Sequence, residues 1–476
     1  MGATQEIQFA LNSYQARSGL LSSQRLLNMY AEPAPPSSPF RYSLIGRPGV
    51  TLWKDLNQFE PVYGAIALGD FIYVVCGLNL YQINATKTAT IIGTLSGTPA
   101  KVQMTTNRTQ ITILTSNGDS YYYDTNTSTF AKITDADYQG SSSVTTLNGY
   151  TIFSVTESDQ FFISELNDTT SYRALDFATA EARPDNLIQV YALNNELWLF
   201  GEKTIEIWGN TGNATFPFER IRGAFIEIGC AAKNSIVNDQ EGIFWLGDDL
   251  SVYQGIGYSG KRISTYPIET EINSYATTDD AFAYFYIQEG HRFYCLSFPT
   301  AGKTWCYDTT TGLWHERSTR NVKTLAEDMW LPNNLVFFDR KNIVGDATTG
   351  KLYELDLDTY TDNGEPIIAE VITATIFKNF SRFNNSRLVL IMDTGVGIDG
   401  EGQGDDPEIM LQFSNDGGKT YSNELWQKLG EIGEYETEVF WPQLGQGRSL
   451  ITKIRISDPI KRNIVAAYIN QEVGNS

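Results

Sequence analysis

The chain has 476 residues, of which 13% are aromatic and 40 are glycine, a composition that favours many short strands and tight turns. Its 35 Lys and Arg against 56 Asp and Glu give a net charge of −21, which argues against a protein that grips nucleic acid. The acidity keeps a large protein soluble, and it is also compatible with a surface along which DNA slides without sticking.

The first 60 residues follow no repeat. Met1–Glu6 has neither a basic start nor an apolar stretch, and no run in the chain reaches the length that spans a bilayer. We therefore expect synthesis in a cytoplasm and no membrane segment. The proline-rich stretch Pro33–Pro39 predicts extended backbone. We interpret residues 1–60 as an N-terminal arm and linker, which lies on the main domain or a neighbouring subunit or serves simply as a linker.

Residues 61–357 repeat one pattern, in which a β-run, a tight polar turn and a second β-run rich in aromatic or branched residues follow each other. The second runs include Ile111–Leu114, Leu197–Phe200 and Leu335–Phe338. The turns lie at Gly69-Asp70, Asn107-Arg108, Asn148-Gly149, Asn194-Asn195, Glu241-Gly242, Glu289-Gly290 and Asn333-Asn334. From Asn148 onward their spacing is about 46, 47, 48 and 44 residues, the length of a four-stranded propeller blade.

These repeats predict an all-β chain whose body is a β-propeller, because such sheets bury their faces only against one another. We count seven four-stranded blades, and six remains possible because the unit around Asn333-Asn334 is the least regular. An open all-β array or stacked sandwiches are the structural alternatives.

Beyond residue 357 the period is lost, and the remaining β-runs predict a β-sandwich-like domain over 358–476. These runs include Ile372–Phe377, Leu388–Ile391, Ile409–Phe413 and Ile451–Ile456.

Several motifs resemble chemical sites but are better explained as structure. Gly255–Gly260 and Gly395–Gly400 match GxGxxG, yet neither precedes a helix, so we interpret both as turns. His291 and His315 are interpreted as ordinary surface or turn residues. The four cysteines form no metal-binding pair and predict buried reduced thiols: Cys76, Cys230, Cys295 and Cys306.

One loop of the C-terminal region is acidic. Between Asp393 and Asp406 it also contains Asp399, Glu401 and Asp405. The spacing does not fit the EF-hand pattern, so an exposed acidic loop is favoured over a calcium site.

Ser414–Tyr421 matches S-x-D-x-G-x-T-aromatic and so resembles the Asp-box of sialidases and related propellers. There the motif braces a hairpin, with the Asp and Ser side chains bonded to the turn backbone, and it is not catalytic. No pair of carboxylates is singled out for glycoside cleavage. A glycan-binding or glycan-cleaving, sialidase-like propeller is nevertheless kept as the alternative function.

The middle of the chain resembles a known family. Phe177–Asp185, Trp198–Gly201, Thr204–Trp208, Thr211-Gly212 and Ile228–Cys230 occur in the order found in packaged-DNA stabilisation proteins of short-tailed bacteriophages, also called tail hub or nozzle proteins. The opening segments Leu27–Ala31 and Gly46–Val50 are similar to the start of that family. The clear resemblance covers about residues 165–260, and a looser one extends along the chain.

The resemblance implies a structural virion protein of the viral tail. It implies a homo-hexameric ring below the portal-adaptor ring, which continues the DNA channel, retains packaged DNA without sequence-specific binding, and functions in DNA ejection. It also implies tailspike or tail-fibre partners and a central needle or plug. No enzymatic motif is carried over, so we predict no catalytic, cofactor-binding or metal-binding residues and no cofactor.

Overall fold

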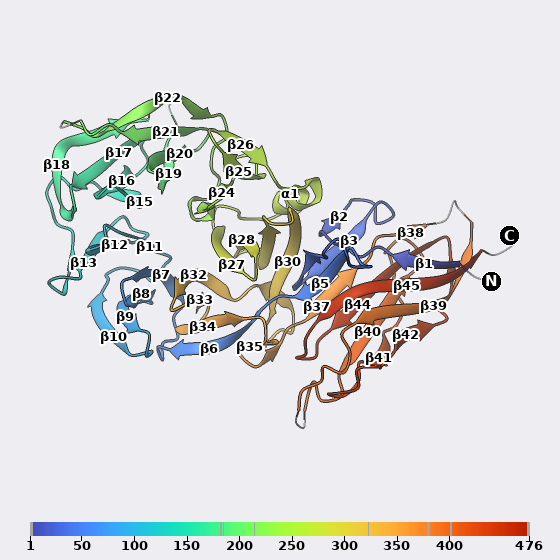
Figure 1. Cartoon of the computed structure of the whole chain (residues 1–476). Coiled ribbons are helices and arrows are strands. Elements are labelled where there is room, and N and C mark those ends of the chain that lie inside the picture. Colours follow the sequence, from blue (N-terminus) through green and yellow to red (C-terminus); the bar gives the residue numbers. More distant parts are fainter. Residues whose placement is uncertain are drawn as a thin grey trace.

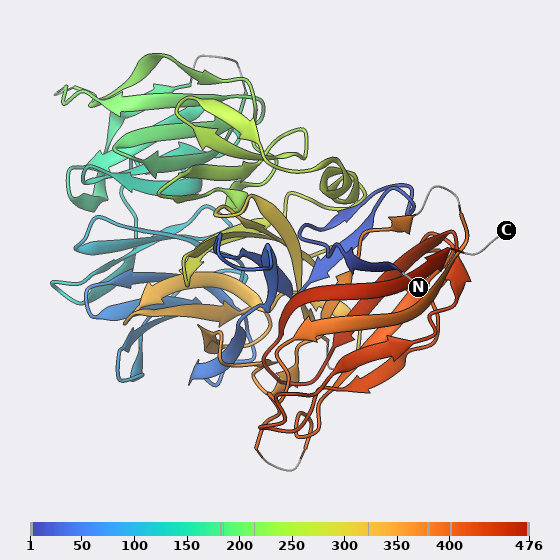
Figure 2. The same cartoon turned by 45° about the vertical axis from the view of Figure 1, so that its right-hand side comes forward.

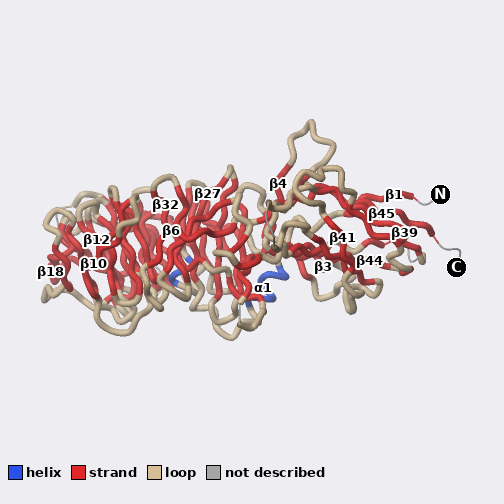
Figure 3. The backbone as a smooth tube through the Cα atoms, turned by 90° about the horizontal axis from the view of Figure 1, so that it is seen from below, coloured by secondary structure: helices blue, strands red, loops and turns tan. Residues whose placement is uncertain are grey.

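The computed structural model describes residues 3–180, 183, 185–213, 215–321, 323–377, 381–399 and 402–473. It confirms the all-β class and the pairing of a β-propeller with a C-terminal β-sandwich (Figure 1). Seen from below, the propeller forms a flat disc with the sandwich at its side (Figure 3). Within these ranges the helices are α1 (Tyr266–Ile272) and the 3-10 turn η1 (Lys233–Ser235). No helix among them is long and apolar enough to cross a membrane.

Six blades are each formed by one continuous segment whose strands pair in antiparallel chain order. The first blade contains β7 (Val62–Leu68), β8 (Phe71–Cys76), β9 (Asn79–Asn84) and β10 (Ala89–Thr94). The second contains β11 (Gln103–Thr106), β12 (Gln110–Leu114), β13 (Ser120–Asp124) and β14 (Thr129–Lys132). The third contains β15 (Ser141–Leu147), β16 (Tyr150–Val155), β17 (Gln160–Glu165) and β18 (Asp168–Thr179). The fourth blade contains β19 (Leu187–Leu193), β20 (Glu196–Gly201), β21 (Ile205–Asn210) and β22 (Phe218–Ile226). The fifth contains β23 (Val237–Asp239), β24 (Gly242–Leu246), β25 (Val252–Ile256) and β26 (Ser259–Arg262). The sixth contains β27 (Phe282–Gln288), β28 (His291–Phe298), β29 (Lys303–Asp308) and β30 (Leu313–Arg320).

A further four-stranded unit closes the ring and is composite. It contains β32 (Pro332–Phe338), β33 (Lys341–Asp346), β34 (Lys351–Asp356) and, from the N-terminal region, β6 (Gly49–Asp55). The hairpin β35 (Thr361–Asp362) and β36 (Glu365–Pro366) extends this sheet beyond β6. Innermost strands β32 and β7 meet, and the Nδ2 groups of Asn333 and Asn334 donate to the Val62 carbonyl at 2.8 and 2.9 Å. The first and last parts of the propeller are thereby joined.

The composite unit corrects one predicted turn. Asn333-Asn334 lies inside β32, and the predicted second strand Leu335–Phe338 is the rest of that same strand. The hairpin turns instead at Asp339-Arg340, where φ is +47° and +60°. A turn with positive φ at both residues usually has a sequence such as Asn-Gly, because few other residues adopt positive φ readily. Asp339-Arg340 does not match that pattern, so the sequence did not indicate the turn. The other six predicted turns lie where the first and second strands of their blades connect, although Gly242 is already the first residue of β24.

The sandwich has two layers around one core (Figure 2). One sheet contains β1 (Ala3–Ile7), β4 (Met29–Pro33), β5 (Tyr42–Gly46), β39 (Phe383–Met392), β42 (Val439–Pro442), β43 (Gln446–Gly447) and β45 (Asn463–Val473). The other contains β2 (Tyr14–Gln15), β3 (Ser23–Leu27), β37 (Ala369–Ile372), β38 (Ile376–Phe377), β40 (Glu408–Ser414), β41 (Leu425–Lys428) and β44 (Ser449–Ile456). The predicted run Ile372–Phe377 is thus interrupted, because Thr373 leaves the ladder and hydrogen-bonds to Thr452.

Residues 1–60, expected to form an arm outside the repeat, are divided between the two domains. β1, β4 and β5 belong to the sandwich, whereas β6 supplies the outer strand of the composite unit. Pro33–Pro39 is not a fully extended stretch. It leads into the turn between β4 and β5, where the Ser38 amide donates to the Pro35 carbonyl at 2.9 Å, because Pro36 already has the φ that such a turn requires.

The two domains share one continuous sheet. β30 of the sixth continuous blade pairs in parallel with β3, and β3 pairs with β37 of the sandwich. β31 (Glu327–Met329) also pairs with β30 at this place. A shared ladder resists hinge motion, because bending would break backbone hydrogen bonds with no replacement.

Candidate interaction sites and the domain junction

The junction between propeller and sandwich is held by a cluster of charged side chains around Arg25 on β3. Its guanidinium lies 2.7 Å from carboxylate oxygens of both Glu316 and Glu327 and 3.1 Å from Glu370. Arg455 on β44 also reaches Glu370, at 2.6 Å. Burial opposes the charge of Arg25, but Glu316 and Glu327 outweigh it and raise the pKa of Arg25 above its ordinary value. Arg25 therefore connects β3 to β30, β31 and β37, and Arg455 connects β37 to β44.

A second junction contact is fully buried. Arg47 follows β5, and its two terminal nitrogens lie 2.9 and 2.6 Å from the carboxylate oxygens of Asp362 on β35. The remaining donors of Arg47 bond to Asn28 Oδ1 and to the carbonyls of Pro48 and Ser318. Such a pair is stable only when every donor and acceptor is satisfied, as here.

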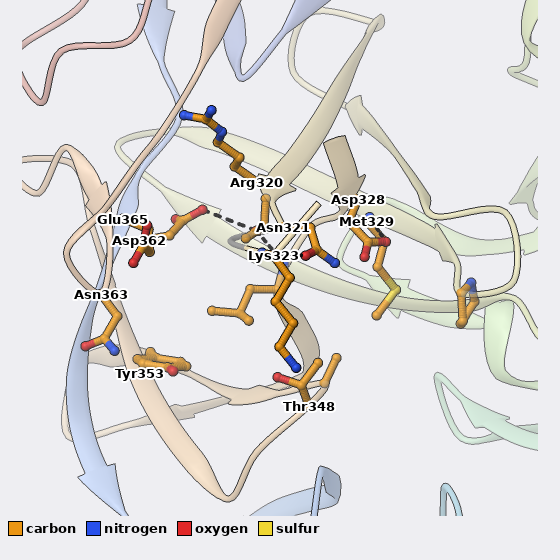
Figure 4. A pocket seen from close by; sticks show the side chains of 14 residues that line it. Arg320, Asn321, Lys323, Asp328, Met329, Thr348, Tyr353, Asp362, Asn363 and Glu365 are labelled. Atoms are coloured by element: carbon orange, nitrogen blue, oxygen red, sulfur yellow. Dashed lines mark hydrogen bonds between the residues drawn. The ribbon is translucent and has the colours of Figure 1, made fainter. Parts of the chain in front are cut away.

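A pocket of about 560 Å³ lies where β30 and the composite unit meet (Figure 4). Asp362, Asn363 and Glu365 line one side of it, and Asn321, Asp328 and Met329 line the other. Asp362 is already bonded to Arg47 and to Thr319 Oγ1, at 3.2 Å. The described lining holds no histidine or cysteine, so it offers neither a thiol nucleophile nor an imidazole base.

The two histidines are buried rather than exposed, which corrects the sequence-based interpretation. His291 Nδ1 lies 2.8 Å from Asp308 Oδ2, and His315 Nε2 accepts from Arg317 Nε at 3.1 Å. The ring of Tyr30 packs against both histidines, with its centroid 4.9 Å from the ring centroid of His291 and 6.2 Å from that of His315. The sequence could not indicate this cover, because Tyr30 comes from the N-terminal region expected to be an arm.

The cysteines are buried and unbridged, as predicted. Cys295 and Cys306 face each other across β28 and β29 with 2.9 Å between their sulfur atoms. Beside them lies the guanidinium of Arg317, whose carbon is 4.6 Å from the ring centroids of Phe293 and Trp330. Burial, with the charge of Arg317 second, lowers the pKa of His315 well below its ordinary value, so this histidine is neutral at physiological pH.

The Asp-box is confirmed as a hairpin brace. Asp416 accepts the Lys419 and Thr420 amides at 3.0 Å, and Ser414 Oγ accepts the Gly418 amide at 2.9 Å. These bonds, first of all those with Thr420, lower the pKa of Asp416. The carboxylate is therefore occupied by its own turn.

The other motifs also form turns or surface contacts. Gly255–Gly260 spans the hairpin of β25 and β26, as predicted. In the second GxGxxG match Gly395 has a φ of +68°, and Gly400 lies outside the described residues, as does Glu401 of the acidic loop. Asp393 and Asp406 of that loop pair with Lys461 and Lys428. In the described part of the chain no three His, Cys, Asp or Glu side chains gather as metal ligands would.

At the centre of the propeller the first strand of each unit faces a pocket of about 520 Å³. Its lining comes from all seven units and includes Ala65, Lys101, Gln103, Thr145, Gln189, Tyr191, Lys233, Asn234, Tyr284 and Asn334. No sequence pattern marked these residues, because ring closure alone brings them together.

Two family models match the chain, one over each domain. The model described as "Bacteriophage P22 Gp10, beta-propeller" matches residues 8–360, and that described as "Bacteriophage P22 Gp10, beta-sandwich" matches residues 369–472. The first match includes the N-terminal region that completes the propeller. No curated protein matches the sequence.

Among solved structures, similarity is distant. The computationally designed Ika8 protein aligns at 8% identity and a TM-score of 0.40, covering 65% of this chain and 99% of its own. A chain of the Mitotic Checkpoint Complex aligns at 11% identity with a TM-score of 0.43, and the alignment covers 68% of this chain and 95% of that one. PorZ of Porphyromonas gingivalis aligns at 13% identity with a TM-score of 0.38, and the alignment covers 70% of this chain and 39% of PorZ.

Proposed function

We propose, from the premise that the chain belongs to the bacteriophage P22 Gp10 family, that it forms the tail nozzle or hub ring that retains packaged DNA. Membership makes it a structural phage tail protein of the DNA-stabilising kind, and one that assembles with other virion components. The observation that carries the proposal is the pair of family matches, which together cover both domains in the same order.

In the proposed assembly, six copies form a ring below the portal-adaptor ring and continue its DNA channel. The net charge of −21 supports this part, because an acidic wall repels the DNA backbone and lets it pass. The shared sheet and the Arg25 cluster support it too, because a ring under internal pressure needs subunits whose two domains do not rotate against each other. The chain is proposed to have no enzymatic activity of its own.

Attachment of tail fibres or spikes, and of a central needle or plug, is proposed for the outer surfaces of this ring. Leu175 and Phe177 on the outermost strand β18 are 84% and 40% exposed, and Phe59 before β7 is 97% exposed. Leu175 and Phe177 are two residues apart on one edge strand, and adjoining exposed apolar side chains are typical of surfaces that become covered by another protein.

Particle mass, measured by mass photometry with and without the purified portal-adaptor complex, tests the assembly. A ring of copies that forms only on the adaptor is expected, since weak contacts act together once a symmetric template aligns them. A chain that stays monomeric on the adaptor, and instead binds or cleaves a glycan, would contradict the proposal.

A further inference from the structure

The axial pocket of the propeller has an unusual charge for this chain. Lys101 and Lys233 are its charged lining residues in the described structure, and no carboxylate of Asp or Glu lines it. In a chain with 56 acidic against 35 basic residues, a pocket that holds two cations and no acid is opposite in sign to the molecule. The side chains that line the pocket therefore supply positive charge and no negative charge.

Neither lysine has a carboxylate partner among the described residues. Lys101 Nζ donates to the carbonyl and the Oδ1 of Asn333, at 2.7 and 3.0 Å, and lies 3.6 Å from the centroid of the Phe282 ring. Lys233 Nζ reaches the Ser142 carbonyl only at 3.4 Å. Buried charges are normally paired with an opposite charge. The two half-buried ammonium groups have no such partner, so a bound anion could serve as their counterion.

Neutral polar groups surround the two lysines. Gln103 Nε2 donates to Gln189 Oε1 at 2.7 Å, and Gln103 Oε1 accepts the Val144 amide at 3.0 Å. Asn234 and the hydroxyls of Thr145 and Thr146 complete this lining. Amides and hydroxyls can donate to an anion without adding charge, and about 520 Å³ is enough for a small molecule.

We propose that the axial pocket is a binding site for a small anion, a carboxylate or phosphate group held between Lys101 and Lys233. The anion is either free, as inorganic phosphate, or part of a sugar acid whose hydroxyls use the surrounding amides. This site belongs to the single subunit, so it does not depend on assembly into a ring.

Binding at this site depends on pH in a defined direction. Burial lowers the pKa of Lys101 to about 7 and also lowers that of Lys233. The other titratable groups of the lining are the phenols of Tyr191 and Tyr284, whose pKa burial raises, so they stay neutral. An anion prefers the protonated lysine, so affinity falls as pH rises through 7, roughly tenfold per unit once Lys101 is mostly neutral.

Isothermal titration calorimetry of the full chain with inorganic phosphate and with glucuronate, at pH 6 and pH 8.5, tests the site. We expect binding at pH 6 by at least one anion. For glucuronate, whose carboxylate stays ionised over this range, we expect a loss of roughly tenfold or more at pH 8.5. Binding of phosphate alone supports the free-anion form of the proposal, and binding of glucuronate alone supports the sugar-acid form. Absence of binding by both overturns it.

Three variants make the test specific. Lys101→Met should weaken binding at pH 6 by tenfold or more, whereas Lys261→Met, which removes an exposed charge from β26 outside the pocket, should leave it unchanged. Lys101→Arg keeps the charge at all these pH values, so it should bind at pH 6 with a weaker pH dependence. Equal binding by Lys101→Met and the native chain would overturn the proposal, as would an unchanged pH dependence in Lys101→Arg.

Discussion

Arg317 is a buried cation surrounded by aromatic rings and thiols, and in the described structure no carboxylate lies within salt-bridge distance of it. Its guanidinium bonds to His315 and to the hydroxyl of Tyr286, and it lies over the ring of Trp330. Ring quadrupoles replace part of the hydration that the charge loses on burial. The remaining positive potential acts on nearby groups that can become negative, which include the hydroxyl of Tyr286 and the two facing thiols.

We therefore predict that mild oxidation with diamide joins Cys295 to Cys306. Burial opposes ionisation of Cys295, but the contact with Cys306 and the charge of Arg317 lower its pKa, which favours the thiolate that starts the exchange. Each thiol loses its hydrogen to the diamide as the sulfur–sulfur bond forms. Non-reducing peptide mapping by mass spectrometry should find this linkage, and Cys306→Ser should abolish it. Crosslinks to Cys76 or Cys230 instead would contradict the prediction.

At the scale of single elements, β6 shows how a distant strand completes a sheet. It pairs with β34 over Gly49–Asp55, about three hundred residues earlier in the chain. Trp53 on β6 is 5% exposed and packs against Phe338 across the composite unit, whereas Leu52 is 45% exposed. Trp53 therefore points into the core, whereas its neighbour Leu52 points toward solvent.

Trp53→Ala should lower the free energy of unfolding by roughly 3–5 kcal/mol, the usual cost of removing a buried Trp. The matched control Leu52→Ala, on the exposed face of the same strand, should cost about 0.5 kcal/mol or less. Urea unfolding gives both values, and hydrogen exchange should show faster exchange in β34 for Trp53→Ala alone. Equal effects of the two substitutions would mean that β6 does not hold the composite unit together.

The buried pair Arg47–Asp362 ties the end of β5 to β35. Asp362→Ala should cost roughly 3–5 kcal/mol of folding stability, because it leaves the Arg47 charge buried without a partner. The double variant Arg47→Met with Asp362→Leu should cost less than the single one, since apolar side chains of similar size replace both charges. Chemical denaturation of the three proteins measures this, and a double variant less stable than Asp362→Ala would refute it.

Six of the seven predicted turns, the propeller and the sandwich could be inferred because hairpin signals are local in sequence. A unit was also predicted around Asn333-Asn334, but its turn at Asp339-Arg340 and its outer strand β6 could not be inferred. The burial of His291 and His315 was missed for the same non-local reason, since Tyr30 covers them. The axial lysines likewise become neighbours only when the ring closes.

At the scale of the whole molecule, the propeller and the sandwich are joined by several connections. The ladder from β27 through β30, β3 and β37 to β44 crosses from one domain to the other, and the Arg25 cluster lies on it. N-terminal strands in both domains add further connections, so neither domain is complete without residues 1–60. Such connected domains agree with the proposed role of the chain in holding the genome.

Retention of DNA by phage particles assembled without this chain tests the central claim most directly. Filled heads that lack it should lose their genome to added nuclease, and the purified chain added before the nuclease should restore protection. Particles that keep a full-length, nuclease-resistant genome in its absence would contradict the account.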